Sequence, residues 1–184
     1  MLKVAITGNI ASGKSEVEKI VSQFYPVYDV DKIAHAILGN VDRKALGEKV
    51  FSNPKALKEL EEFIHPKVKQ EIMNVFNGIE TERNIAGLIA PSLNKNIIFI
   101  SIPLLFETGF EILFDKIIFV QCDDNLRLQR LIKRNNYTEE YAKKRMDSQL
   151  PQEDKIKNSD FVLNNNSSKE DLKAQVLELL KNLG

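Results

Sequence analysis

The residues best suited to chemistry lie near the N-terminus, in the string Gly8-Asn9-Ile10-Ala11-Ser12-Gly13-Lys14-Ser15. This string fits the pattern G-x-x-x-x-G-K-[ST], which cradles phosphates when it joins a strand to a helix. Glycines let the chain curl so that backbone amides and the positive end of the following helix meet the anion. Lys14 would reach the terminal phosphates, and the Ser15 hydroxyl would complete the oxygen shell of Mg²⁺. The string, extended to Glu16, therefore predicts a nucleoside triphosphate site.

The sequence also indicates which base the nucleotide carries. A switch GTPase would contain D-x-x-G and N-K-x-D, and neither string occurs, because Asn94-Lys95-Asn96 is followed by Ile97. ATP is therefore the favoured nucleotide. The same absence favours transfer of a phosphoryl group to an acceptor over a switch.

Two carboxylates, Asp29 and Asp31, flank Val30 after an apolar segment. The carboxyl end of a strand is where open α/β sheets bind ligands, and alternation along a continuing strand would put both carboxylates on one side. One could accept the proton of a substrate hydroxyl and the other could hold magnesium through water. Asp29 could equally cap a helix that begins near Lys32, whereas a catalytic role is favoured for Asp31.

A basic stretch from Arg127 to Arg145 contains seven lysines and arginines against two glutamates. Arg127, Arg130 and Arg134 recur at helical spacing and so share a face, which would suit the charge of a transferring phosphoryl group. Most such runs are solvated helix faces. Arg134 and Arg145 are favoured as phosphate contacts because they border a loop that is predicted to be mobile.

Short apolar segments rich in Val, Ile or Phe predict the scaffold. Helical periodicity separates them, so they predict a parallel sheet covered on both faces, an α/β fold. A capping box at Ser167 and Glu170 marks the start of the last helix. The five predicted strands are Leu2–Thr7, Pro26–Asp29, Asn96–Ile102, Lys116–Gln121 and Phe161–Leu163.

About 65 residues, from Asp31 to Lys95, exceed what one crossover connection needs and predict an inserted helical subdomain. Within it, Pro66 should divide the apolar stretch into two helices, because the residue before a proline avoids helical torsions. By the same reasoning, His65 is more simply a helix cap than a ligand. Residues 77–96 are expected to form a polar, loop-rich return.

Composition excludes several classes of protein. Lysine plus arginine and aspartate plus glutamate each total 26, so no global field would draw the chain onto nucleic acid or an acidic membrane. A single cysteine, Cys122, excludes an intramolecular disulfide. The most apolar run, Ile97 to Phe106, is too short to cross a bilayer, and no export signal is expected. A cytoplasmic protein is predicted.

The order of several strings resembles the dephospho-coenzyme A kinase family over nearly the whole chain. Beyond the phosphate-binding string, His65-Pro66 and Pro103-Leu104-Leu105-Phe106-Glu107 are the more specific matches. The others are Asp29-Val30-Asp31, Asp42-Arg43 with Val50-Phe51, Leu60 to His65, and Arg127 to Arg134 followed by Gln149.

The resemblance implies transfer of the ATP γ-phosphate to the ribose 3′-hydroxyl of dephospho-coenzyme A, with Mg²⁺. It implies a three-layer α/β/α P-loop kinase with a core (about 1–31, 96–134 and 159–184), a helical substrate subdomain (about 32–95) and a lid (about 135–158). The implied partners are small molecules, with no nucleic acid and no membrane.

By the same resemblance, particular residues take roles. Asp31 would accept the proton, Lys14 and Ser15 would hold phosphates and magnesium, and Arg134 and Arg145 would contact phosphate from the lid. His65 and Glu107 would lie on the substrate side.

One position departs from the family's pattern. Family members often carry an acid where this chain has Ser101, which leaves Asp29 and Asp31 as the main candidates for the magnesium acid, and Asp29 is the predicted metal ligand beside Ser15. Two alternatives remain: a kinase of another metabolite, such as a nucleoside monophosphate, and a non-catalytic ATP-binding module.

Overall fold

A parallel sheet forms the centre of the fold, as seen in a computed structural model that describes residues 1–39, 53–90 and 96–183. The strand order is β3-β2-β4-β1-β5-β6, and β1 pairs in parallel with β4 and β5, as β5 does with β6. The strands are β1 (Leu2–Thr7), β2 (Val27–Asp29), β3 (Leu88–Ala90), β4 (Ile97–Ser101), β5 (Lys116–Gln121) and β6 (Phe161–Asn164).

The prediction of five strands was wrong by one. Each predicted strand exists, with an end displaced by one residue at most, but β3 lies in the stretch predicted to be a loop. At three residues β3 is too short to show alternation; β2 is equally short and was predicted as an apolar segment, not from alternation.

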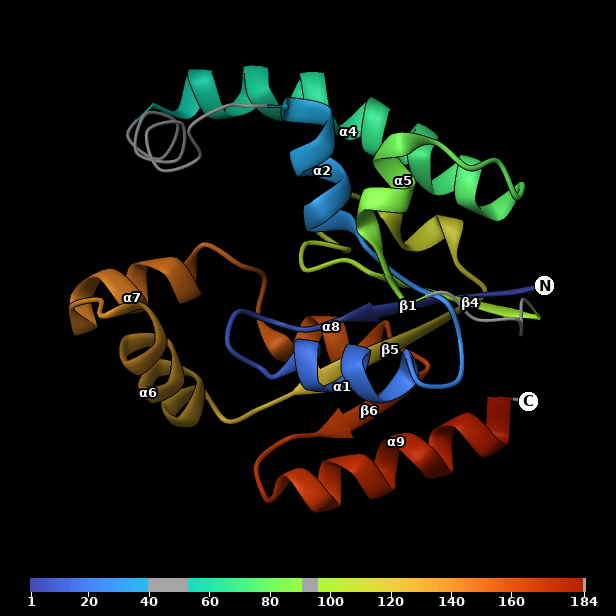
Figure 1. Cartoon of the computed structure of the whole chain (residues 1–184). Coiled ribbons are helices and arrows are strands. Elements are labelled where there is room, and N and C mark those ends of the chain that lie inside the picture. Colours follow the sequence, from blue (N-terminus) through green and yellow to red (C-terminus); the bar gives the residue numbers. More distant parts are fainter. Residues whose placement is uncertain (40–52, 91–95, 184) are drawn as a thin grey trace. The chain divides into compact units, whose positions relative to one another are not determined.

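Both faces of the sheet are covered, which makes the three-layer architecture. Helices α1 (Lys14–Val21) and α9 (Lys169–Leu183) lie on one face of the sheet (Figure 1). The strand residues Val4, Phe99 and Val120 form one buried hydrophobic cluster there with Val17 of α1 and Val176 of α9. The alternate residues Ala5, Ile98, Ile100, Ile117 and Phe119 are buried as well. Strands buried on both faces explain the near-continuous apolar runs in the sequence.

Between β4 and β6 the chain forms η1 (Phe110–Leu113), α6 (Asp124–Asn135), α7 (Glu139–Asp147) and α8 (Gln152–Lys157). The last helix begins one residue later than predicted. Ser168 Oγ accepts from the amide of Asp171 at 3.1 Å while the Asp171 carboxylate accepts from the amide of Ser168, so the capping box is Ser168–Asp171 rather than Ser167–Glu170.

The chain divides into two compact units, Met1–Tyr28 with Ile89–Gly184, and Asp29–Leu88. The second unit contains α2 (Val30–Leu38), α4 (Pro54–Phe76) and α5 (Glu82–Gly87). None of the helices in the described residues could cross a membrane.

Pro66 does not divide α4, which runs through it for 23 residues. A proline inside a helix removes one hydrogen bond and costs about 3 kcal/mol. Val68, Ile72 and Val75 are buried beyond it, so packing of the apolar face offsets that cost. The predicted break considered only the torsional preference of His65 before the proline, and the packing of the apolar face beyond Pro66 was not part of it.

Within the predicted loop, residues 77–90 are more ordered than expected. Thr81 caps α5 through a reciprocal pair with Asn84, and Thr81 Oγ1 donates to the buried Glu71 at 2.6 Å. A Cβ on Gly87 would lie 2.5 Å from Ile33, so only glycine lets α5 approach α2 this closely. The capping signal was present in the sequence, with asparagine in place of the usual glutamate.

Candidate functional site

The predicted phosphate-binding string forms a tight loop between β1 and α1. Ala11 and Gly13 have positive φ values of 62° and 95°, and the Ser12 amide donates to the Asn9 carbonyl at 3.0 Å. Asn165 donates from Nδ2 to the Ser12 carbonyl at 2.7 Å and so fixes the loop from the β6–α9 connection. These contacts hold the loop in its curled shape.

We expect Gly13→Ala to abolish ATP binding and to lower the melting temperature. A Cβ at this position would lie 1.9 Å from Asn165 Nδ2, and a φ of 95° strains any residue that carries a Cβ. Gly109→Ala is the matched control, because Gly109 has a φ of 68° but no atom of the described residues lies within 4 Å of the added carbon. Calorimetry with ATP and thermal melts measure both effects. Normal ATP affinity in Gly13→Ala would show that the loop does not bind the phosphates.

Side chains from distant segments hold the outer side of the loop. The Ile10 amide donates to Gln149 Oε1 at 2.7 Å, and Arg127 Nε donates to the Ile10 carbonyl at 3.0 Å. Asn9 Nδ2 donates to the Leu150 carbonyl. A cleft of about 280 Å³ opens here, lined by Asn9, Asp124, Arg127, Met146, Asp147, Gln149, Leu150, Pro151, Gln152 and Glu153.

Some polar side-chain atoms in the loop and just before it are buried without a hydrogen-bond partner among the described residues. Thr7 Oγ1, Asn9 Oδ1 and Ser12 Oγ are buried and lack a hydrogen-bond partner among the described residues. At the start of α1 the Glu16 amide donates to the Gly13 carbonyl at 2.9 Å, and no side chain of the described residues caps the helix. Buried polar groups are usually paired, so this concentration at one loop fits a site whose partners arrive with a ligand.

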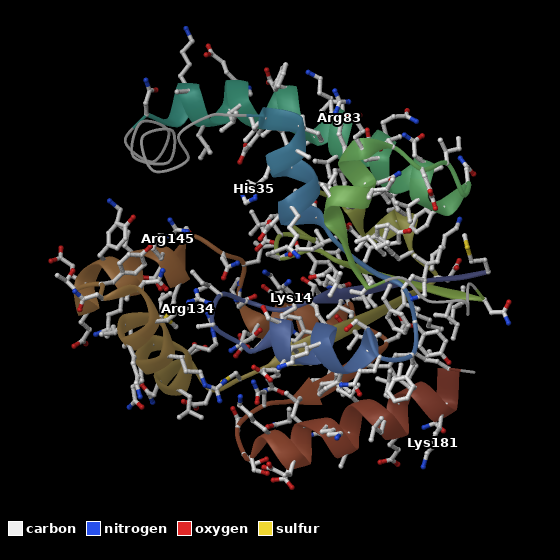
Figure 2. The ribbon with its side chains drawn as sticks, in the orientation of Figure 1. Lys14, His35, Arg83, Arg134, Arg145 and Lys181 are labelled. Carbon is white, nitrogen blue, oxygen red and sulfur yellow. The ribbon has the colours of Figure 1, made fainter. Side chains whose placement is uncertain are left out.

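Lys14 begins α1, as Figure 2 shows, and its ammonium contacts the carboxylate of Glu18 and the hydroxyl of Ser101. Glu18 and Ser101 are also hydrogen-bonded to each other and are 6% and 0% exposed. The neighbouring Ser15 is exposed, and Glu16 lies 3.5 Å from Lys169 on the surface. Glu18 was not predicted from the sequence, although its spacing of four residues from Lys14 places the two side chains on one face of a helix.

The arginines of α6 do not act as one face. Arg127 is buried, pairs with Asp124 at 2.7 Å and supports the loop, and burial lowers the pKa of its guanidinium. Arg130 donates to the Asn165 carbonyl at 3.1 Å. Of these three arginines Arg134, which bonds to the adjacent Asn135 in the last turn of α6, is the exposed one, and Arg145 lies in the last turn of α7 (Figure 2). The basic stretch therefore combines loop support with cations at helix ends.

Glu107 forms an ion pair with Lys155, and the two charged atoms are 2.6 Å apart. Lys155 is 1% exposed, and burial lowers its pKa against the opposing effect of Glu107. The same Glu107 oxygen accepts from the Leu150 amide at 3.2 Å, whereas its other oxygen is buried with no partner in the part of the chain described here. Glu107 thus ties the segment after β4 to α8.

In the second unit, β2 ends at Asp29 and α2 begins at once, so the expected alternation of the two acids does not occur. Asp29 caps the helix, accepting from the Asp31 amide at 2.9 Å, and Asp31 is exposed in the first turn. His65 is half-buried within α4 rather than at a helix start. No cluster of three potential metal ligands of the His, Cys, Asp and Glu types occurs among residues 1–39, 53–90 and 96–183.

Comparison with known proteins gives one consistent family. The family model described as dephospho-CoA kinase matches residues 36–171. The dephospho-CoA kinase of Fusobacterium nucleatum is 38% identical over 92% of this chain and 92% of its own, and that of Geobacillus kaustophilus is 34% identical over 98% and 96%. A solved dephospho-CoA kinase from Campylobacter jejuni has a TM-score of 0.68 and 31% identity, covering 98% of this chain and 96% of its own.

Proposed function

Because the chain belongs to the dephospho-CoA kinase family, we propose that it transfers the γ-phosphate of ATP to the ribose 3′-hydroxyl of dephospho-CoA. The products are CoA and ADP, and the reaction is the last step of CoA biosynthesis. The observation that carries the proposal is the curled loop of residues 8–15, in which Asn9 Oδ1 and Ser12 Oγ are buried without a partner among the described residues, next to Lys14. Such a loop is suited to a polyphosphate.

The residues of the loop take the phosphate side of the reaction. Backbone amides of residues 8–15 bind the phosphates, and Lys14 offsets charge on the β- and γ-phosphates as the bond to phosphorus breaks. Ser15 and Asp29 offer the oxygen donors that Mg²⁺ prefers, and their exposed or half-buried side chains fit such a role. When bound, Mg²⁺ would neutralise phosphate charge. Arg145, within the segment we propose as the lid (residues 135–158), and Arg134, at its border, supply further positive charge.

The acceptor side rests on other residues. Asp31 orients the ribose hydroxyl and takes its proton, because an alcohol is a weak nucleophile at neutral pH. We assign the substrate to the helical subdomain, residues 32–95, with His65 and Glu107 among its contacts. ATP and dephospho-CoA would be the partners of this protein in the cytoplasm, without nucleic acid or membrane.

A coupled assay of ADP release tests the function. The purified protein is given ATP and Mg²⁺ with dephospho-CoA, and in parallel with nucleoside monophosphates. We expect ADP release when dephospho-CoA is the acceptor and none when a nucleoside monophosphate is the acceptor. Turnover with a monophosphate would establish the alternative kinase, and tight ATP binding without transfer to any acceptor would establish a non-catalytic module.

We expect a non-hydrolysable ATP analogue to slow hydrogen exchange over residues 135–148. This segment overlaps the basic stretch Arg127 to Arg145, whose seven cations outnumber its two glutamates, repel one another in the absence of phosphates and gain partners when phosphates bind, so closure depends on the ligand. Mass spectrometry of exchange measures it, and α9 serves as the internal control because its buried face already packs on the sheet. Equal exchange at saturating analogue would mean that the segment is ordinary solvated surface.

A further inference from the structure

Three side chains meet beside the phosphate-binding loop in an arrangement that the proposed function does not use. The Lys14 ammonium contacts Glu18 and Ser101, and those two contact each other. The side chains of Lys14 and Glu18 are only 14% and 7% exposed, and Ser101 is fully buried. The ion pair is therefore unlike the exposed pairs of this protein, such as Lys58–Glu62 at 77% and 67%.

The fold brings these groups together from two elements. Lys14 and Glu18 lie four residues apart on α1, so they share a face, and helical side chains lean toward the N-terminus, which points Glu18 back at the loop. Ser101 is the last residue of β4, which pairs directly with β1. Its small side chain leaves space for a carboxylate that arrives from the helix.

We propose that Glu18 is a positioning residue for Lys14, with Ser101 as its support, an inference that rests on the proposed function. A buried carboxylate needs a paired cation, and Lys14 is the cation that Glu18 contacts. The pair holds the ammonium at the carboxyl edge of the sheet, where ligands bind in open α/β folds. A helix-borne acid thus stands at the end of β4, where the family resemblance leads one to expect an acid on the strand itself.

This arrangement has a particular kinetic consequence. Glu18 places negative charge beside an anion site, so it does not favour ATP binding in the ground state. Its benefit is a lysine that is already in place when the transferring phosphoryl group develops charge. Loss of the carboxylate should therefore lower kcat without weakening ATP binding.

Glu18→Gln tests this separation, because it keeps the shape and one acceptor oxygen but loses the charge. We expect kcat to fall about 10- to 100-fold, the range for partners that orient a functional group. We expect the Kd for ATP, measured by calorimetry without acceptor, to stay equal or decrease. Asp160→Asn is the control, since Lys116 and Asp160 form an acid–lysine pair at 2.7 Å at the start of β5; it should leave kcat and Kd unchanged.

Rescue from the strand is the sharper test. In a Glu18→Ala background, Ser101→Asp returns a carboxylate to the end of β4. We expect the kcat of this double variant to be at least about ten-fold higher than that of Glu18→Ala alone. A full kcat in Glu18→Gln, an equal loss of kcat and ATP affinity, or no rescue would each overturn the proposal. An equal loss would mean that Glu18 only keeps the loop folded.

A readout without acceptor separates this inference from the proposed function. In ¹H–¹⁵N spectra of the nucleotide-free protein, a held Lys14 ammonium exchanges its protons slowly and gives a signal, assigned by its loss in Lys14→Ala. We expect the signal in the parent protein and not in Glu18→Gln. If the parent does not phosphorylate dephospho-CoA, the proposed function fails, while this signal still decides whether Glu18 holds Lys14. A signal that persists in Glu18→Gln contradicts the inference whatever the acceptor.

Discussion

Lys14→Ala is expected to lower turnover by about 10²- to 10³-fold, the usual effect of removing one preorganised group that stabilises transition-state charge. The lysine opens α1 at the end of the loop, and phosphoryl transfer depends on positioning and on electrostatic stabilisation more than on covalent chemistry by the protein. Steady-state rates with saturating ATP and dephospho-CoA measure the effect. Activity within a few-fold of the parent would show that the loop does not act on the transferred phosphate.

The structure adds a control that the loop motif alone would not suggest. Lys14→Ala leaves the carboxylate of Glu18 buried without its cation, and breaking a buried pair costs about 3–5 kcal/mol of stability. The double variant Lys14→Met/Glu18→Gln removes both charges and should recover much of the melting temperature. It should remain as inactive as Lys14→Ala. A double variant that regained turnover would mean that the single variant had failed through misfolding.

The features predicted from the sequence are those that a short stretch of chain determines by itself. Local composition predicts the strand Leu2–Thr7, the loop and α1. The spacing of glycines, lysine and serine in the loop motif predicts that it binds phosphates. The five apolar strands were found because burial on both faces leaves uninterrupted runs of Val, Ile and Phe. These local signals were enough to predict the parallel sheet and the strand, loop and helix on which the nucleotide-site prediction depends.

The features that were missed depend on contacts between distant residues. From the sequence alone, Pro66 predicts the end of a helix, because the buried face beyond it is a tertiary feature. Arg127 likewise resembles a surface cation in the sequence, whereas in the structure it donates to the Ile10 carbonyl. Asp29 and Asp31 were placed on a continuing strand, yet the chain turns into α2 at Val30 because Asp29 caps that helix. Torsional preference and periodicity carry no information about such partners.

Asp29→Asn is expected to raise the Mg²⁺ concentration needed for half-maximal turnover while leaving the acceptor step largely intact. Asparagine is as good an N-cap as aspartate, so the bond to the Asp31 amide and the start of α2 are kept. The substitution therefore removes the charge and little else. Titration of activity against Mg²⁺ at fixed ATP measures the shift, and an unchanged titration would leave Asp29 with its capping role alone.

Asp31→Asn should instead abolish most turnover while ATP binding, measured by calorimetry without acceptor, stays near normal. A general base contributes roughly 10²- to 10⁴-fold, and asparagine retains a hydrogen-bonding oxygen but neither charge nor basicity. Because phosphoryl transfer is often loose, part of the effect of Asp31 is orientation of the hydroxyl, which places the expected loss toward the lower end of that range. Asp31 is exposed in the first turn of α2, so the loss should come without a lower melting temperature. An Asp31→Asn variant that turns over normally beside an inactive Asp29→Asn variant would reverse the two roles, and full activity in both would make the acid pair structural.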